Sequence, residues 1–260
     1  MDSKFTPSEM MAVRAAAELA DGEVIFVGIG LPNLACNLAR ATHAPNLFMI
    51  YESGAVGAVP DRLPVSIGDP ALVTNCLSVV SQADIFQSYL QRGLIEVGFL
   101  GGAQIDRFGN LNTTVIGSYQ NPAVRLPGSG GACEIAIHSQ RVLIVMRMTP
   151  KNFVETCDFV TSPGSRFQSK VPSPLIGKTR KELGLPGSGP TTVITDLGVC
   201  EFQNDEMVLT EIYPGVEVDE VKKSCGWALK ISASLKSTAT PSPASIQLLR
   251  EKLDPQRLYL

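Results

Sequence analysis

The sequence predicts an α/β fold: an open, largely parallel sheet flanked by helices, with a small antiparallel portion towards the end of the chain. Apolar, strand-like runs at 24–27, 47–50 and 95–100 each end in small residues. Segments with the helical spacing of apolar residues alternate with these runs, as expected where helices join parallel strands. Later in the chain, two apolar runs flank a short polar turn at 203–205, which is typical of an antiparallel pair.

The first elements form a helix, a strand and a second helix. The first helix is predicted from about residue 8 to 20, with Thr6 or Ser8 as its N-cap. After the strand at 24–27, a glycine turn leads into a second helix at 33–41. The free N–H groups at the start of that helix face the edge where parallel strands end, which suits an anionic ligand.

The rest of the chain continues the alternation. The further predicted elements are, in order, the strand 47–50, a turn-rich stretch 60–70, a helix 83–91, strands at 95–100, 135–137, 141–146 and 191–195, an antiparallel pair 199–202 and 207–212, and helices near 218–223 and 243–250. The segment 162–190 is rich in Pro, Gly, Ser and Lys, and it is predicted to be a long surface excursion.

Composition excludes several classes of function. At 260 residues the chain is long enough for one large domain, here taken as 1–260. Its net charge of -3 and scattered basic residues argue against a nucleic-acid partner. Six separated cysteines without a C-x-x-C pair, and only two histidines, predict reduced thiols and no metal site. The sequence shows no leader pattern and no membrane span, so a cytoplasmic protein is expected.

Glu52 is the main candidate for chemistry. It follows the apolar run 47–50 and precedes the small residues 54–58, so the end of a strand would present its carboxylate without bulky neighbours. Taken alone, a glutamate in this position is more often an ordinary solvated loop acid. The neighbouring glycine turns favour a ligand edge, because the carboxyl ends of parallel strands are where open α/β folds bind ligands.

Four motifs occur in a fixed order along the chain. They are Gly28-Ile-Gly30-Leu-Pro, Tyr51-Glu52-Ser-Gly54, the run from Gly101-Gly102-Ala-Gln104-Ile-Asp106 through Asn110 and Asn112, and Gly128-Ser-Gly130-Gly131-Ala. With this order the chain resembles, over nearly its whole length, the β subunits of the family I CoA-transferases. The resemblance is strongest to the branch that contains 3-oxoadipate and glutaconate CoA-transferases.

The resemblance implies an enzyme of α and β chains, with the active site at their junction and the nucleophilic glutamate, here Glu52, supplied by β. A carboxylate can attack an acyl-CoA carbonyl and form an acyl-glutamyl anhydride, then a glutamyl-CoA thioester. This route uses a coenzyme A thioester as substrate and needs no permanently bound cofactor or metal. The donor would be succinyl-CoA or acetyl-CoA, and the acceptor a short dicarboxylic or 3-oxo acid, with 3-oxoadipate favoured and glutaconate next.

The same resemblance assigns roles to further residues. Backbone N–H groups of Gly130 and Gly131 are expected to form the oxyanion hole, although the pair also fits a simple turn. The candidates for binding CoA or substrate are Gly28, Gly30, Gly54, Gly101, Gly102, Gln104, Asn110 and Asn112. The three amides have an alternative role in holding loops together. Cys133 is expected to fill space rather than act as a nucleophile.

Two other functions remain open at the sequence level. Members of this fold also hydrolyse or decarboxylate CoA esters, and Glu52 does not exclude water as the acceptor. A non-catalytic metabolite-binding module is the alternative from a different class. The chain carries no appended basic helix-turn-helix that would favour a sensor.

Overall fold

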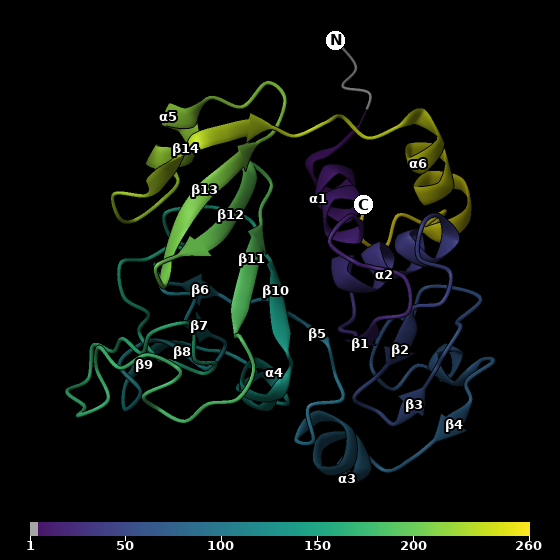
Figure 1. Cartoon of the computed structure of the whole chain (residues 1–260), viewed down its shortest axis with the longest axis horizontal. Helices are drawn as coiled ribbons and strands as arrows, with labels where there is room; N and C mark the ends of the chain where they lie inside the picture. Colours follow the sequence, from purple (N-terminus) through teal and green to yellow (C-terminus); the bar gives the residue numbers. More distant parts are fainter. Residues whose placement is uncertain (1–4) are drawn as a thin grey trace. The chain divides into compact units, whose positions relative to one another are not determined.

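The computed structural model describes residues 5–260, which group into two compact units. Unit 1 contains the described chain up to Phe99 together with Thr240–Leu260, and unit 2 is Leu100–Ala239. Figure 1 draws both, coloured along the sequence. The assignment of 1–260 to a single domain stays a prediction. Residues 1–4, which are part of the segment inspected for a leader, lie outside the described chain.

The strands of unit 1 follow the order β5-β1-β2-β3-β4. β1 (Val24–Phe26) lies between β5 (Val97–Leu100) and β2 (Phe48–Ile50) and runs parallel to both. The sheet continues with antiparallel β3 (Ala55–Val56) and β4 (Ser78–Val79). The three predicted parallel strands are therefore confirmed, and their carboxyl ends lie at one edge.

Helix α1 (Pro7–Ala16) opens unit 1 with a capping box. The N–H of Glu9 donates to Thr6 Oγ1 at 3.1 Å, and the N–H of Thr6 donates to a Glu9 carboxylate oxygen at 2.6 Å. Thr6 is thus the cap, and the helix ends four residues before the predicted end. The other helical segments of unit 1 are α2 (Leu31–Ala41), η1 (Pro70–Val73), α3 (Gln82–Asp84), η2 (Ile85–Leu90), α6 (Pro243–Leu248) and η3 (Leu249–Leu253).

Apolar side chains of the sheet and its helices form the core of unit 1. α1 packs against α2, and η3 also contacts α2, so two segments far apart in sequence cover the same helix. The fully buried members include Met10, Met11, Ile25, Leu34, Met49, Ile50 and Val97. Burial of such side chains contributes about 1.5–3 kcal/mol each, which fixes the strands whose ends carry the candidate site.

The strands of unit 2 follow the order β14-β13-β12-β11-β10. β10 (Arg141–Val145) and β11 (Pro190–Ile194) are parallel, and β11 pairs antiparallel with β12 (Gly198–Gln203). β12 and β13 (Glu206–Ile212) form the antiparallel pair that the sequence predicts. Edge strand β14 (Lys230–Ser237) was not predicted, because its residues are exposed or half-buried and carry little apolar pattern.

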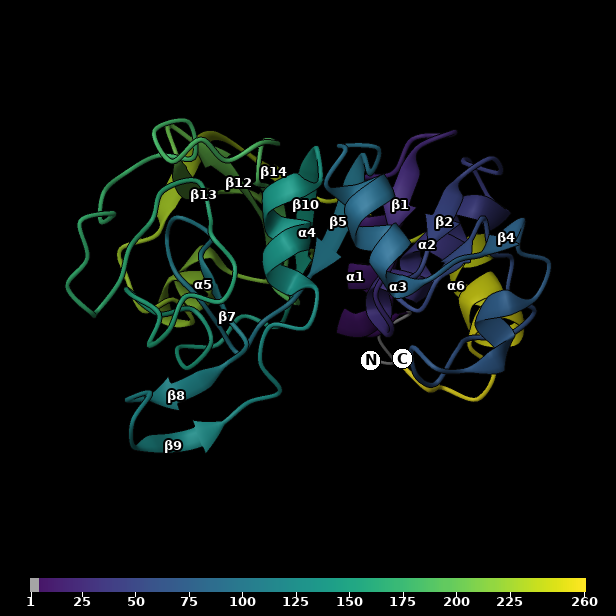
Figure 2. The same ribbon diagram turned by 90° about the horizontal axis from the view of Figure 1, so that it is seen from below.

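Smaller elements complete unit 2. These are the pair β6 (Gln104–Ile105) and β7 (Leu111–Asn112), the hairpin of β8 (Val115–Gly117) and β9 (Pro122–Arg125), and the helices α4 (Ala132–His138) and α5 (Val218–Lys223). Figure 2 shows the β8–β9 hairpin extending from the rest of unit 2. The predicted helices near 218–223 and 243–250 are confirmed.

The predicted strand at 135–137 is wrong, because this segment lies inside α4. The N–H of Ile135 donates to Gly131 O at 2.9 Å, and Glu134 pairs with His138 one turn later at 3.2 Å. His138 is accordingly a helix residue and not a strand residue. A three-residue apolar run is compatible with both the helical and the strand periodicity. Only the tertiary contacts of the segment decide between a helix and a strand.

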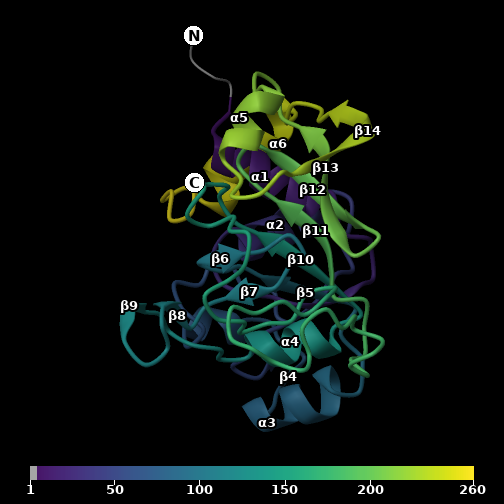
Figure 3. The ribbon, with the colours of Figure 1, turned by 90° about the vertical axis from the view of Figure 1, so that its left-hand side faces the viewer.

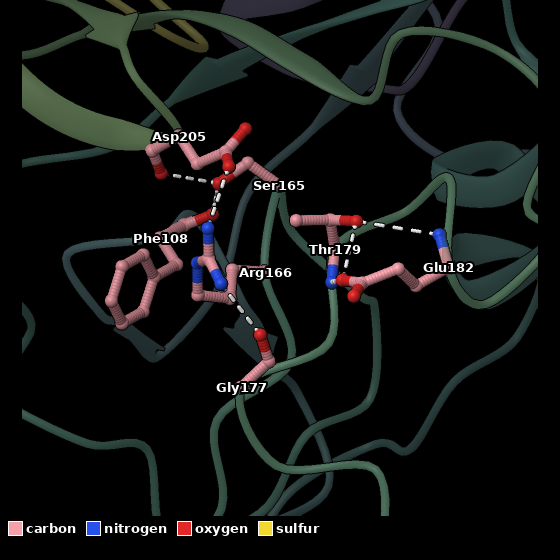
Figure 4. Close-up of polar contacts among 7 residues, drawn as sticks. All are labelled: Phe108, Ser165, Arg166, Gly177, Thr179, Glu182 and Asp205. Atoms are coloured by element: carbon pink, nitrogen blue, oxygen red, sulfur yellow. Dashed lines mark hydrogen bonds and ion pairs between the residues drawn. The ribbon is translucent and has the colours of Figure 1, made fainter.

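The predicted excursion at 162–190 is confirmed, since no named helix or strand lies between β10 and β11. Polar contacts fasten it, as Figure 4 shows. Ser165 Oγ donates to the carbonyl of Phe108 at 3.0 Å, and the Arg166 guanidinium pairs with Asp205 at 2.9 Å. Thr179 N donates to the Glu182 carboxylate at 2.8 Å and closes a local turn.

Arg180 ties this excursion to α4, which lies beside it in Figure 3. Its side chain is buried, and burial lowers its pKa to about 10. The guanidinium donates to six backbone carbonyls at 2.8–3.4 Å: those of Ala136, Ile137, Pro163, Gly164, Pro186 and Gly187. Two of these are carbonyls in the last turn of α4, where a cation is favourable.

Candidate active site

Glu52 lies in the turn that joins β2 to β3, and it is half-buried. Gln82 Nε2 donates to Glu52 Oε1 at 3.0 Å. Within residues 5–260 we find no donor to the other carboxylate oxygen, Oε2. The carboxylate is therefore oriented through one oxygen, while the second is left for an incoming group.

The shape of this turn depends on Gly54. Gly54 has φ of 109°, a value that L side chains rarely adopt, and its N–H donates to Tyr51 O at 3.0 Å. A Cβ atom at this position would lie 2.0 Å from the carbonyl oxygen of Val80. The N–H of Val80 in turn donates to Gly54 O at 3.0 Å. Because Gly54 has no side chain, the backbone at Val80 can approach the Glu52 turn closely.

Tyr51 anchors the same turn in the interior of unit 1. Its side chain is 1% exposed, and Asn33 Nδ2 on α2 donates to its hydroxyl at 2.6 Å. Asn37 Nδ2 donates to Asn33 Oδ1 at 2.9 Å and orients that amide. Burial raises the pKa of Tyr51, so the phenol stays neutral. The sequence patterns gave no role to Asn33, Asn37 or Gln82, although two asparagines four residues apart on a helix lie on the same side of it.

Gly28 and Gly30 lie on the same sheet edge as Glu52. Phe26 pairs with Ile50, and the N–H of Val27 donates to Ile50 O at 2.9 Å, so both chains leave the sheet side by side. A Cβ atom added at Gly28 would have no other heavy atom within 4 Å, and Gly30 has φ of 98° at the N-cap of α2. Unit 1 therefore brings together four of the predicted site residues: Gly28, Gly30, Glu52 and Gly54.

The remaining predicted residues belong to unit 2. Gly101 and Gly102 directly follow β5, and each approaches backbone closely. A Cβ at Gly101 would lie 3.1 Å from Val145 O, and one at Gly102 would lie 3.2 Å from Gln104 O. These contacts give both glycines a packing role, whatever else they bind.

Gln104 and Asn112 are joined by a hydrogen bond between β6 and β7. Asn112 Nδ2 donates to Gln104 Oε1 at 2.8 Å and to Val115 O at 2.6 Å, and its own Oδ1 accepts the N–H groups of Thr114 and Val115. Gln104 Nε2 donates to Asp158 Oδ2 at 3.1 Å. Because both amides are buried and satisfied by protein partners, their contacts favour the loop-holding alternative, and a contact with CoA stays a prediction.

Asn110 has similar surroundings, beside a buried acid. Its Nδ2 donates to Asp106 Oδ2 at 2.8 Å and to Arg166 O at 2.9 Å, and its Oδ1 accepts the N–H of Gly164 at 2.9 Å. Asp106 is 0% exposed, and burial raises its pKa to about 7 despite the donors around it. This cluster also fits the scaffold role that the sequence left open for Asn110.

Gly130 and Gly131 stand immediately before α4. Gly130 has φ of 47°, and Gly131 is the N-cap of the helix. Thr113 Oγ1 donates to Gly128 O at 2.8 Å and holds the loop that carries them. In the described chain no acceptor meets the N–H of either Gly130 or Gly131. Two free, neighbouring N–H groups are compatible with the predicted oxyanion hole, which stays a prediction.

The described residues contain no cluster of side chains that could hold a metal ion, and all six cysteines are free thiols. Burial raises the pKa of Cys133, which does not favour a thiolate nucleophile there. Between residues 5 and 260, none of the helices has the length and apolarity needed to cross a membrane. The chemistry available at the sheet edge of unit 1 is that of a carboxylate beside open backbone.

Comparison with known proteins decides the family. The family model for coenzyme A transferase matches residues 8–224. The chain belongs to the coenzyme A transferase family. Within it, the chain is 47% identical to the β subunit of the 3-oxoadipate CoA-transferase of Pseudomonas knackmussii, over 95% of this chain and 93% of that one. This places it among the β subunits of the CoA-transferases.

Solved structures of CoA-transferase relatives confirm the α/β fold. The glutaconate coenzyme A-transferase of Acidaminococcus fermentans matches with a TM-score of 0.88 and 34% identity, covering 98% of this chain and 97% of that chain. The decarboxylase AibA/AibB matches with a TM-score of 0.82 and 25% identity over 98% and 97% of the two chains. The predicted enzyme class, a CoA-transferase, is therefore confirmed, and its substrate is a separate question.

Proposed function

We propose that this chain is the β subunit of a heteromeric CoA-transferase that uses Glu52 as its nucleophile. The observation that carries the proposal is the setting of Glu52 in a chain of this family. Its carboxylate is oriented through one oxygen by Gln82, has its second oxygen available, and stands at the carboxyl edge of a parallel sheet beside Gly28. Such an edge is where open α/β folds bind ligands.

The reaction exchanges CoA without net change in acyl activation. Glu52 attacks the carbonyl carbon of the donor acyl-CoA, the C–S bond breaks, and CoA leaves as a thiolate, giving an acyl-glutamyl anhydride. The thiolate then attacks the glutamyl carbonyl and releases the donor acid, which leaves a glutamyl-CoA thioester. The acceptor carboxylate attacks this thioester, and the same steps in reverse give the new acyl-CoA and restore Glu52.

Each addition step places negative charge on a carbonyl oxygen. We assign the backbone N–H groups of Gly130 and Gly131 to that charge, because the described chain provides them with no acceptor. A well-aimed donor of this kind contributes about 3 kcal/mol to transition-state stabilisation. Gly28, Gly30 and Gly54 are proposed to line the path of the substrate, since all three lie at the Glu52 edge and carry no side chain that would obstruct it.

For the acyl group we propose 3-oxoadipate first and glutaconate second, with succinyl-CoA or acetyl-CoA as donor. The support is the 47% identity to the β subunit of a 3-oxoadipate CoA-transferase and the fold match to glutaconate CoA-transferase. Because these relatives are named as subunits, they support an α chain as partner of this one.

The test is intact-mass spectrometry of this chain, purified with its α partner and incubated with one donor acyl-CoA at a time without acceptor. We expect an adduct at Glu52 with the mass of CoA less one water, and hydroxylamine should release its CoA and leave a hydroxamate on Glu52. Glu52→Ala should abolish the adduct and the transfer while leaving the unfolding temperature nearly unchanged, because an exposed hydrogen bond contributes little stability. Glu155→Ala, at an exposed glutamate of unit 2, is the matched control.

A CoA-ester hydrolase or decarboxylase is the second candidate, favoured by the fold match to the decarboxylase AibA/AibB. The same incubation separates the functions. Steady release of free CoA without acyl transfer would indicate hydrolysis, and loss of carbon dioxide with the thioester intact would indicate decarboxylation. Binding of ligand without any of these products would support the metabolite-binding module and contradict the proposed transfer.

A further inference from the structure

Gln82 lies beside Glu52 because two backbone segments meet there. The N–H of Val80 donates to the carbonyl oxygen of Gly54 at 3.0 Å. Val80 precedes Gln82 by two residues, and Gly54 follows Glu52 by two residues, so this contact brings the two side chains together. Gln82 Nε2 donates to Glu52 Oε1 at 3.0 Å, and in the part of the chain that the structure describes no second side chain donates to this carboxylate.

The start of α3 fixes the backbone of Gln82. Ser81 Oγ accepts the N–H of Asp84 at 3.1 Å, and the Asp84 carboxylate accepts the N–H of Ser81 at 3.3 Å, which together form a capping box. One turn later, the ring of Phe86 packs against Phe26 of β1, with the ring centroids 5.8 Å apart. Gln82 itself is exposed, so its amide can be replaced without loss of core packing.

The proposed transfer attacks two different carbonyl groups. The first belongs to the donor's acyl group, and the second is the one that Glu52 acquires in the anhydride. Glu52 attacks through Oε2, the oxygen without a donor in the described chain, so Oε2 becomes the bridge of the anhydride and Oε1 its glutamyl carbonyl oxygen. The CoA thiolate then adds to Glu52 Cδ, and the C=O electron pair moves onto Oε1. When this pair returns, the bond from Cδ to the bridging oxygen breaks, and the donor acid leaves with that oxygen.

We propose that Gln82 is a catalytic residue that stabilises the negative charge on Glu52 Oε1 each time the glutamyl carbonyl is attacked. Its amide donates to this oxygen before the reaction begins, so the donor is in place when the charge develops. In the anhydride and the thioester Oε1 is a neutral carbonyl oxygen, and the hydrogen bond therefore strengthens on the way to the transition state. A preorganised donor of this kind accelerates a step about a hundredfold. The inference rests on the proposed function, because this charge arises only if Glu52 is the nucleophile.

The experiment compares Gln82→Met with the wild-type chain, each purified with the α partner. Both are incubated with succinyl-CoA, and separately with acetyl-CoA, until the glutamyl-CoA thioester reaches a constant level, and the free donor is then removed. Hydroxylamine is added, and intact-mass spectrometry follows the loss of CoA. Glu52 is no longer a nucleophile in this step, so the orientation of its carboxylate does not affect the rate, whereas stabilisation of charge on Oε1 does. The variant thioester should react at least about tenfold more slowly.

Gln247→Met is the matched control. Gln247 is also an exposed residue of unit 1, and its Nε2 donates to a glutamate, Glu251, at 2.9 Å. The thioester of this control should react at the wild-type rate. Gln82→Asn is a second variant, which keeps the amide but is one methylene shorter, and its thioester should also react slowly, since misplacement near 1 Å can cost roughly a hundredfold. The unfolding temperature of each variant should lie within a few degrees of that of the wild type.

A wild-type rate for the Gln82→Met thioester would overturn the catalytic role. This holds also if only the formation of the thioester were slower, because that pattern belongs to a residue that orients the nucleophile. If the wild-type enzyme formed no thioester with either donor, the proposed function would be overturned and this inference with it. Slow reaction of the Gln82→Met and Gln82→Asn thioesters, with an unchanged Gln247→Met thioester, would support the inference.

Discussion

Glu52 and Asp106 are two carboxyl groups in opposite surroundings. Glu52 is half-buried and accepts one hydrogen bond from Gln82, which leaves its second carboxylate oxygen without a donor in the described chain. Asp106 is fully buried among the N–H groups of Phe108 and Asn110, and burial raises its pKa to about 7. A carboxyl group thus belongs to the proposed reaction at one position and to loop structure at the other.

Asp106 predicts a pH dependence of stability. Its pKa is raised from 3.8 in the folded chain, so between about pH 4 and pH 7 the folded state binds a proton that the unfolded state has lost. The stabilisation is complete below pH 4 and disappears as the pH rises through 7. Relative to Asp106→Asn, the wild-type free energy of unfolding should therefore fall from pH 5 to pH 8, by about 1.4 kcal/mol per unit of the pKa difference that this range covers.

Denaturant unfolding at several pH values measures this difference. Asp61→Asn, at an exposed position, is the control. Its free energy of unfolding should change with pH in parallel with that of the wild type. If the free energy of unfolding of Asp106→Asn also changed with pH in parallel with that of the wild type, Asp106 would not titrate in this range.

At the scale of elements, hydrogen bonds replace regular structure in the excursion between β10 and β11. Its position was predictable, because Pro, Gly and Ser exclude long helices and strands from it. The hydrogen bonds from Arg180 that hold the excursion in place were not predictable, since their acceptors are backbone carbonyls that no sequence pattern marks. The helix α4 was predicted wrongly as a strand for a related reason, because three apolar residues fit both periods.

Arg180→Met should lower the free energy of unfolding by about 3 kcal/mol. The substitution leaves buried carbonyls of α4 and of the excursion without donors, and unsatisfied buried groups cost about 1–3 kcal/mol each before relaxation. Denaturant unfolding of the purified chain is the measurement. Lys181→Met, at the exposed neighbouring position, is the control and should change stability by less than about 0.5 kcal/mol. A loss below about 1 kcal/mol for Arg180→Met would contradict its role as a tie.

At the scale of the whole molecule, the proposed enzyme requires a second chain. We expect this chain alone to show no CoA transfer, and an equimolar mixture with its α partner to restore it. The physical reason is that the substrate has to be enclosed and shielded from water, whereas the Glu52 edge of unit 1 is open in the described chain. Size-exclusion chromatography together with a transfer assay measures both assembly and activity. Full activity of the isolated chain would refute the requirement.

The family resemblance, the α/β alternation and the place of Glu52 at the end of a strand could all be predicted from the residues. These follow from local signals: apolar periodicity, glycine turns and the order of four motifs. The tertiary structure alone decided which distant groups meet. It placed Gln82 on the Glu52 carboxylate, Asn33 on the Tyr51 hydroxyl and six carbonyls around Arg180. Such partners are chosen by packing and by the need to satisfy buried polar groups, which no local pattern encodes.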